Sequence, residues 1–106
     1  MDNAYVVVVV ATSSKQEAET IAQTLLEAKL VACVNIVGPV FSRFHWAEKI
    51  DHAEEHIMLM KTKADLFEAV SEKVKALHSY KVPEVIALPV MCGSREYLAW
   101  IDTVLR

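Results

Sequence analysis

The spacing of apolar residues changes along the chain, and each change marks a predicted element. A nearly unbroken run of valine over residues 5–11 is typical of a strand buried on both faces, because β-branched side chains favour the pleated backbone. Apolar residues then recur every three or four positions across 14–29, where Ser14 and Glu17 have the spacing of a capping box. The chain is therefore predicted to open with a central strand followed by one amphipathic helix.

Two further strands are predicted in the middle of the chain. Residues 31–37 and 40–46 have strand character and are separated by a Gly-Pro pair, which marks a bend or bulge because proline lacks an amide donor. The polar segment 47–53 is predicted to be a hairpin connection, and 54–62 to be the third strand.

The last part of the chain is predicted to hold a helix, a strand and a final helix. Thr62 is a candidate N-cap for a helix that ends near His78, because the residue before Pro83 is disfavoured in helical conformation. Residues 84–90 form the fourth predicted strand, and Ser94 opens the C-terminal helix.

The order β-α-β-β-α-β with an added C-terminal helix predicts an α+β fold of the ferredoxin-like type, as a single domain over residues 1–106. Two right-handed strand–helix–strand units then interleave into one antiparallel sheet, and both helices cover the same face. Pro89 places the end of the fourth strand at a sheet edge or bulge. Because the strands are apolar on both sides, we expect self-association into a closed symmetric ring to cover the open face.

Composition and charge narrow the range of partners. The 106 residues weigh 11.9 kDa, and a net charge of −3 argues against binding to nucleic acid or to an anionic membrane surface. No window approaches the roughly 20 apolar residues of a membrane-spanning helix, and the N-terminus lacks the basic start of a secretory signal. Cys33 and Cys92 are far apart and indicate reduced thiols in a cytoplasmic protein.

The segment from His52 to His56 matches the H-x-x-E-H pattern of inverted zinc metallopeptidases. That chemistry requires both histidines on one helical face. The segment leads directly into an apolar strand, and in a strand the two residues would lie roughly 13 Å apart. A solvated hairpin is therefore the favoured interpretation, and a zinc peptidase is the alternative.

Soft side chains are also present. Met58 and Met60, together with the two cysteines, are of the kind that Cu(I) prefers. Methionines two positions apart on a strand more often fill a core, and this is the favoured interpretation. Cys33 is expected to be buried and inert, and Cys92, beside a glycine, to be more exposed and reactive.

His78, Tyr80 and Glu84 cluster in the loop between the second predicted helix and the fourth strand, with Lys81 and Pro83 between them. A histidine and a carboxylate this close can ligate a metal or share a proton. In the alternative, His78 caps the helix C-terminus, where a partly cationic ring favours the helix dipole. The sequence shows no combination of nucleophile, base and orienting group, so an enzyme is not predicted.

Several stretches, in their order and spacing, together resemble the CutA divalent-cation tolerance family across essentially the whole chain. They are residues 32–36, 42–46, 61–62, 78–84, 86–90 and 97–101. The resemblance implies a ferredoxin-like protomer in a tight homotrimer, whose architecture is similar to that of the trimeric PII signalling proteins. It also implies a role in tolerance of divalent metals, with copper or another divalent metal ion as the candidate ligand.

The resemblance also transfers candidate site residues one by one. His78 and Glu84 match the family's His-x-Tyr-x-x-Pro-Glu positions and are the candidate metal ligands, and Lys61 and Tyr80 join them as candidate ligand-binding residues. The expected interface or structural residues are Trp46, Pro83, Pro89 and Trp100. Trp100 is expected to seal a domain or subunit boundary, and Trp100→Ala to cost about 3–5 kcal/mol if the ring is fully buried.

Some positions depart from the family pattern. Phe44 stands where a tyrosine is common, Ser79 where a proline is frequent, and Lys81 where an acidic residue or glutamine is usual. The cysteine that some members carry at the end of the first strand is missing, because residues 9–12 are Val-Val-Ala-Thr. A soft-metal site built on that thiol is therefore not expected in this chain.

The favoured hypothesis is a cytoplasmic homotrimer with a non-catalytic role in tolerance of copper and other divalent metals. The alternative is a PII-like sensor that binds a nucleotide or small anion between subunits, where Lys61 and Lys81 would meet phosphate. That alternative lacks a Gly-rich or multi-basic loop in the sequence. A small hydrolase on the same topology is a third hypothesis, since fold alone does not set function.

Overall fold

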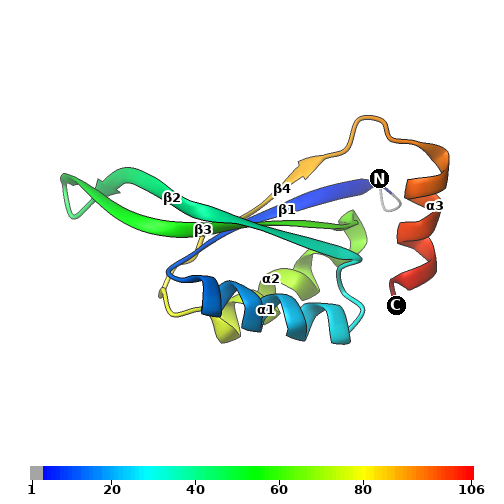
Figure 1. Ribbon diagram of the computed structural model, residues 1–106, viewed down its shortest axis with the longest axis horizontal. Coiled ribbons are helices and arrows are strands. Elements are labelled where there is room, and N and C mark those ends of the chain that lie inside the picture. The colour runs from blue at the N-terminus through cyan, green and yellow to red at the C-terminus, as the bar shows by residue number, and fades with distance from the viewer. Residues whose placement is uncertain (1–3) are drawn as a thin grey trace.

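A four-stranded sheet carries two helices on one of its faces in the computed structural model, which describes residues 4–106 (Figure 1). The strand order is β2-β3-β1-β4, and every neighbouring pair is antiparallel. In chain order the elements are β1 (Tyr5–Thr12), α1 (Lys15–Glu27), β2 (Cys33–Trp46), β3 (Lys49–Lys63), a 3-10 turn η1 (Ala64–Leu66), α2 (Phe67–Leu77), β4 (Val85–Pro89) and α3 (Arg95–Val104). The predicted α+β class, element order and added C-terminal helix are confirmed.

β1 is a central strand, and its alternate valines serve the two faces of the sheet. Val6, Val8 and Val10 point toward α1 and α2 and are buried, whereas the positions between them face the other side. The buried core on the helix side is completed by side chains from the helices, β3 and the loop after α1: Ile21, Leu25, Leu30, Met58, Met60, Val70 and Val74. Met58 and Met60 are fully buried, so their interpretation as core residues is confirmed.

Helix α1 begins as predicted, but α2 does not. The Ser14 hydroxyl oxygen accepts a hydrogen bond from the amide of Glu17 at 3.1 Å, which makes Ser14 the N-cap. Thr62 still belongs to β3, where its hydroxyl donates to the carbonyl of Leu30 at 2.7 Å. Pairing with β1 keeps the chain extended through Lys63, and η1 then leads into α2 without a side-chain cap. The prediction of an N-cap at Thr62 is therefore wrong.

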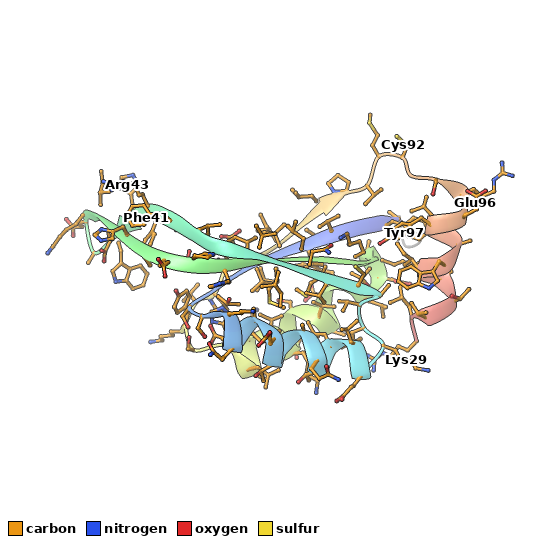
Figure 2. The ribbon with its side chains drawn as sticks, viewed as in Figure 1. Lys29, Phe41, Arg43, Cys92, Glu96 and Tyr97 are labelled. Atoms are coloured by element: carbon orange, nitrogen blue, oxygen red, sulfur yellow. The ribbon has the colours of Figure 1, made fainter. Side chains whose placement is uncertain are left out.

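Beyond the helices, β2 and β3 continue as a two-stranded projection, here named the arm (residues 40–55; Figure 1). A register shift between Val37 and Val40 marks its base, at the Gly-Pro pair where the sequence predicts a bend. Phe41 lies on this projection and is exposed, as Figure 2 shows. The arm therefore carries apolar surface away from the core of the chain.

The connection at the tip of the arm is much shorter than predicted. It consists of Ala47 and Glu48, which have φ angles of 51° and 61°, and Lys49 already pairs with Trp46. Two residues with positive φ match the right-handed twist of a tight hairpin. The predicted connection over 47–53 is wrong, because the sequence lacks the Asn-Gly or Asp-Gly pair that usually marks such a turn.

The sheet face opposite α1 and α2, here named the open face, is apolar as expected. Val7 and Val9 of β1 pair with Leu88 and Ile86 of β4, so these four side chains share that face. Leu88 is 52% exposed in the single chain. Pro89 ends β4, which is an edge strand as predicted. An apolar face that one chain leaves in water is typical of an assembly surface.

Helix α3 is attached to the end of the sheet by a polar cluster. The Tyr5 hydroxyl donates to Asp102 Oδ2 at 2.7 Å, and Lys63 Nζ lies 2.9 Å from Asp102 Oδ1. Ile101 is the buried residue of this helix, whereas Trp100 is 43% exposed and stacks on Tyr97 with ring centroids 5.5 Å apart. One chain therefore does not bury Trp100 fully, and the large cost expected for a buried ring does not apply to the chain by itself.

Gly38→Ala is expected to destabilise the fold by roughly 1–3 kcal/mol. The φ angle of Gly38 is +158°, and an added Cβ would lie 2.7 Å from Cδ2 of His56. Gly93→Ala is the matched control: its Cβ would meet Cδ2 of Leu98 at 3.1 Å, and the end of that side chain can move. Urea unfolding of both variants measures the difference, and equal losses of stability would contradict the assignment of strain to Gly38.

Candidate functional site

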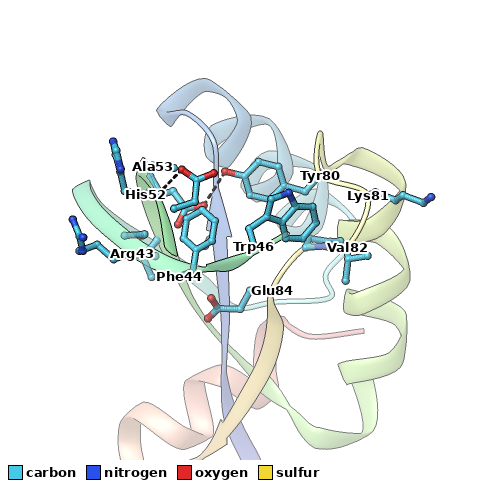
Figure 3. Close-up of a pocket in the computed structure, with 15 residues that line it drawn as sticks. Arg43, Phe44, Trp46, His52, Ala53, Tyr80, Lys81, Val82 and Glu84 are labelled. Carbon is cyan, nitrogen blue, oxygen red and sulfur yellow. Dashed lines mark hydrogen bonds between the residues drawn. The ribbon is translucent and has the colours of Figure 1, made fainter. Parts of the chain in front are cut away.

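A pocket of about 910 Å³ lies between the arm and the loop that joins α2 to β4 (Figure 3). Its polar and aromatic side chains come from β2, β3 and that loop: Ser42, Arg43, Phe44, Trp46, Asp51, His52, Glu55, Tyr80, Lys81 and Glu84. This volume lies within the range of pockets that bind small molecules.

The structure brings together four of the residues singled out from the sequence. Trp46, Tyr80, Pro83 and Glu84 all line the pocket, although Trp46 lies far from the other three in the sequence. The hairpin of β2 and β3 carries Trp46 at its tip, and the arm extends over the loop that holds the others.

Lys61 lies on the open face and not in the pocket. Its Nζ donates to Asn35 Oδ1 and lies 4.0 Å from Cys33 Sγ. Lys61 pairs with Val7 of β1. Ala11, the residue of β1 that lines the pocket, is four residues further along the strand, or roughly 13 Å. One chain therefore does not combine Lys61 and Lys81 in a single phosphate-binding site.

His78 is buried at the C-terminal end of α2. Its amide donates to the carbonyl of Val74 at 2.9 Å, its ring Nε2 lies 2.8 Å from the carbonyl oxygen of Ala11, and its Nδ1 accepts from the amide of Tyr80 at 3.0 Å. A carbonyl oxygen only accepts, so Nε2 is the donor to Ala11. His78 is the C-cap residue, so the position that one interpretation gave it is confirmed, whereas the cationic ring of that interpretation stays a prediction. The ring faces β1, and a metal would have to displace one of its hydrogen bonds.

Glu17 holds the beginning of the same loop. Its carboxylate accepts from the amide of Ser13 at 2.9 Å and from the amide of Ser79 at 2.6 Å. Burial by itself raises the pKa of Glu17, but the hydrogen bonds outweigh burial and lower the pKa from 4.5 to about 2. At neutral pH the ionised carboxylate therefore ties the end of β1 to the loop that lines the pocket.

Tyr80 and Glu55 contact each other inside the pocket. The Tyr80 hydroxyl donates to Glu55 Oε2 at 2.8 Å, and Glu55 is only 7% exposed. Burial, followed by the hydrogen bond to Glu55 and its charge, raises the pKa of Tyr80 from 10.0 to about 12, so the hydroxyl remains a donor.

Glu55 is a site residue that the sequence analysis missed. Glu55 belongs to the H-x-x-E-H segment, which was interpreted as a solvated hairpin, but it is buried on β3. The available signal was the alternation of β3, which puts Glu55 on the same side of the strand as Ile57 of the apolar run.

The H-x-x-E-H segment is extended and belongs to β3. His52 stacks on Phe41 with ring centroids 5.3 Å apart, and His56 pairs with Thr12 of β1. Four residues of strand separate the two histidines by roughly 13 Å, which is too far for a shared zinc ion. The helical arrangement that a zinc peptidase requires is absent from this segment, which is strand throughout. The interpretation as a solvated hairpin holds for the exposed His52 but not for Glu55, which is buried.

The metal hypothesis requires that enough ligands lie close together. Across residues 4–106, no three His, Cys, Asp or Glu side chains are grouped so that they could hold a metal ion. Cys33 is partly exposed rather than buried as expected, Cys92 is exposed, and both thiols are free. The residues of one chain therefore do not fit a preformed three-ligand site.

These features define a class: a small α+β protein of ferredoxin-like topology, with one small-molecule-sized pocket described above and an uncovered apolar sheet face. Residues 6–104 match the model of the family described as CutA1 divalent ion tolerance protein, and the chain belongs to this family. The resemblance drawn from the sequence motifs is thereby confirmed. The family is named for tolerance of divalent ions and not for a class of enzyme.

Known relatives agree over nearly the whole chain. The chain is 44% identical over 95 residues to the divalent-cation tolerance protein CutA of Thermus thermophilus, covering 90% of this chain and 92% of that one. It is 40% identical to the chloroplastic protein CutA 1 of Oryza sativa, covering 95% of this chain and 57% of that longer protein. The solved structure of CutA1 from Oryza sativa has a TM-score of 0.95 at 38% identity and covers 99% of this chain and 96% of its own.

The names of the relatives refer to different compartments. The Oryza sativa protein is called chloroplastic, and a solved CutA from Archaeoglobus fulgidus is called periplasmic; the latter has a TM-score of 0.93 at 43% identity and covers 96% of this chain and 99% of its own. Within residues 4–106, each helix is too short or too polar to cross a membrane.

Glu17→Gln is expected to lower the free energy of unfolding at neutral pH, because a neutral amide accepts the hydrogen bonds from Ser13 and Ser79 less strongly. The folded-state pKa of Glu17 is about 2 and its ordinary value is 4.5, so the contribution is fully present above pH 4.5 and is lost as the pH falls toward 2. Urea unfolding should therefore show a difference in the free energy of unfolding between wild type and variant, and this difference should disappear as the pH falls toward 2.

Glu19→Gln provides the control for this prediction, because Glu19 is exposed on the same helix. The free energy of unfolding of Glu19→Gln should differ little from that of the wild type at every pH. A Glu17→Gln gap that does not change with pH would show that the carboxylate charge is not what holds the loop.

Proposed function

We propose that this chain is a non-catalytic, cytoplasmic homotrimer that acts in tolerance of divalent cations, copper among them. The observation that carries the proposal is the match of residues 6–104 to the CutA1 divalent ion tolerance family. Relatives from Thermus thermophilus and Archaeoglobus fulgidus carry the divalent-cation tolerance name, and the match covers 92% and 90% of their lengths.

The trimer is supported by apolar surface in two places. On the open face, Leu88 is half exposed, and on the arm Phe41 and Ile50 are each exposed by more than 60%. Covering such surface stabilises an assembly by about 25 cal/mol per Å² of apolar area removed from water. A closed ring of three, similar in architecture to the trimeric PII signalling proteins, covers the open faces and gives the half-exposed Trp100 a neighbour.

We propose that contact with copper or another divalent ion is weak and reversible. Glu84 is exposed at the pocket, and His78 already uses both ring nitrogens within the chain, so capture of a metal there costs a hydrogen bond. This fits the lack of a three-ligand group among residues 4–106. Lys61 and Tyr80 remain the other candidate ligand-binding residues, in two separate parts of the chain.

The proposed cytoplasmic location is supported by Cys33 and Cys92, whose thiols are both free. The alternative of a PII-like phosphate sensor is not favoured, because the pocket contains Lys81 but not Lys61.

Leu88→Glu is expected to convert the assembly, three times the 11.9 kDa mass of the chain, into a monomer. A carboxylate buried in an apolar contact without a cation costs several kcal/mol. The control is Leu26→Glu on α1, which lies on the helix side, is 38% exposed and should leave the trimer intact. Light scattering measures both masses; wild-type monomer at micromolar concentration would overturn the trimer, and a trimeric Leu88→Glu would exclude this face as the contact.

Glu84→Gln is expected to reduce the copper retained by the purified, untagged trimer, because it removes the exposed carboxylate of the candidate metal pair. Equilibrium dialysis followed by metal analysis measures copper per chain. Glu72→Gln, at an exposed position of α2, is the matched control. Retention that is the same in both variants would place the copper contact outside the loop.

A cellular experiment tests the tolerance role itself. Expression of the wild type in a copper-sensitive host should raise the copper concentration that permits growth, and Leu88→Glu should lose this effect if the trimer is the active form. Growth that does not depend on wild-type expression would contradict a role in tolerance, whatever the oligomer mass.

A further inference from the structure

The pocket contains a buried carboxylate that has no cationic side chain beside it among residues 4–106. Glu55 is 7% exposed, and its hydrogen bond comes from the neutral hydroxyl of Tyr80 to Oε2. Among residues 4–106, no Lys, Arg or His nitrogen lies within ion-pair distance of its carboxylate. A buried carboxylate in this situation is strongly stabilised by a cation supplied from outside.

The second oxygen of Glu55 is open to the pocket. Oε1 makes no hydrogen bond within the described chain. Every fully buried side-chain nitrogen or oxygen in residues 4–106 does have a hydrogen-bond partner, so Oε1 is not fully buried. Oε1 is therefore accessible, and the space that Glu55 lines is the pocket. A cation in the pocket can contact Oε1 while Oε2 keeps its bond to Tyr80.

Aromatic rings surround the same space. Phe44, Trp46 and Tyr80 all line the pocket, and Trp46 is 64% exposed (Figure 3). The faces of aromatic rings attract cations, and they contact alkyl groups favourably as well. An ion that carries its charge among methyl or methylene groups satisfies both the rings and the carboxylate.

The basic side chains of the pocket do not fill this space. Arg43 and Lys81 belong to the lining, but Figure 3 shows both extending away from the aromatic rings. The lining holds three carboxylates, those of Asp51, Glu55 and Glu84, against these two cationic side chains, so it favours a positively charged occupant.

We infer that this pocket binds a small organic ammonium ion, with its charge at Glu55 and its alkyl groups against Phe44, Trp46 and Tyr80. A transition metal needs several nitrogen, oxygen or sulfur donors, and within residues 4–106 no three His, Cys, Asp or Glu side chains are grouped so that they could hold one. The pocket lies at the arm end of the open face, beside Ala11, so it is at the margin of the contact proposed around Val7 and Leu88.

Choline is the probe, and 3,3-dimethylbutan-1-ol, which has the same shape without the charge, is its matched control. Both are titrated into the assembled, full-length protein, and binding is measured by calorimetry and by the two indole N–H resonances. Choline should bind about 10-fold more tightly than the neutral alcohol. It should shift the resonance of Trp46 and leave that of Trp100, on α3, unchanged.

Two variants separate charge from shape. Glu55→Gln keeps the side-chain shape and an acceptor for the Tyr80 hydroxyl, and it should weaken choline binding about 10-fold without changing binding of the alcohol. Glu54→Gln, at the adjacent exposed position that faces the other side of β3, should bind both probes like the wild type. Trp46→Leu should weaken both probes, because it removes the aromatic face.

Three results would overturn this assignment. Equal affinity for choline and the alcohol would show that charge is not recognised, and equal behaviour of Glu55→Gln and Glu54→Gln would show that Glu55 is not the partner. An unchanged Trp46 resonance in the assembled protein would show that the pocket is closed there, as it would be if a second copy filled it. Copper binding that Glu55→Gln abolishes, without any choline binding, would assign the pocket to a metal.

Discussion

The sheet of this protein is apolar on both faces, and a single chain has helices for only one of them. The right-handed connections place α1 and α2 on the same side, where Val8 and Met58 are fully buried. On the opposite side, Val9 of β1 and Leu88 of β4 remain in contact with water, although they belong to the same strands whose other side is packed. The open face and the proposed trimer both follow from this unequal coverage.

The arm is positioned by strand pairing, and the pocket beside it is shaped by the hydrogen bonds of two carboxylates. Pairing of β2 with β3 continues to a two-residue turn, which carries Trp46 past the helices and over the loop after α2. Two carboxylates fix that loop: Glu17 through the amide of Ser79, and Glu55 through the hydroxyl of Tyr80. The pocket is therefore bounded by hydrogen bonds on one side and by exposed aromatic rings on the other, which is the combination that the proposed ammonium site uses.

Much of the fold could be predicted because its signals are local. The valine run, the Ser14 cap and the Gly-Pro pair each act through nearby backbone, and each lies where expected. The errors concern competition between local and long-range contacts. Thr62 is a good cap in isolation, but pairing with β1 holds it in a strand, where it bonds to Leu30 across the fold.

The sequence by itself determined the element order, the apolar character of both faces of the sheet, the resemblance to the family, and the presence of Trp46, Tyr80 and Glu84 as residues of interest. Only the tertiary structure decided that these three share a pocket without Lys61, that both ring nitrogens of His78 are occupied, and that Glu55 is a buried charge. The reason is physical. Periodicity records which side of an element meets apolar surroundings, whereas the partners of a polar atom depend on strand register and on loops that join distant parts of the chain.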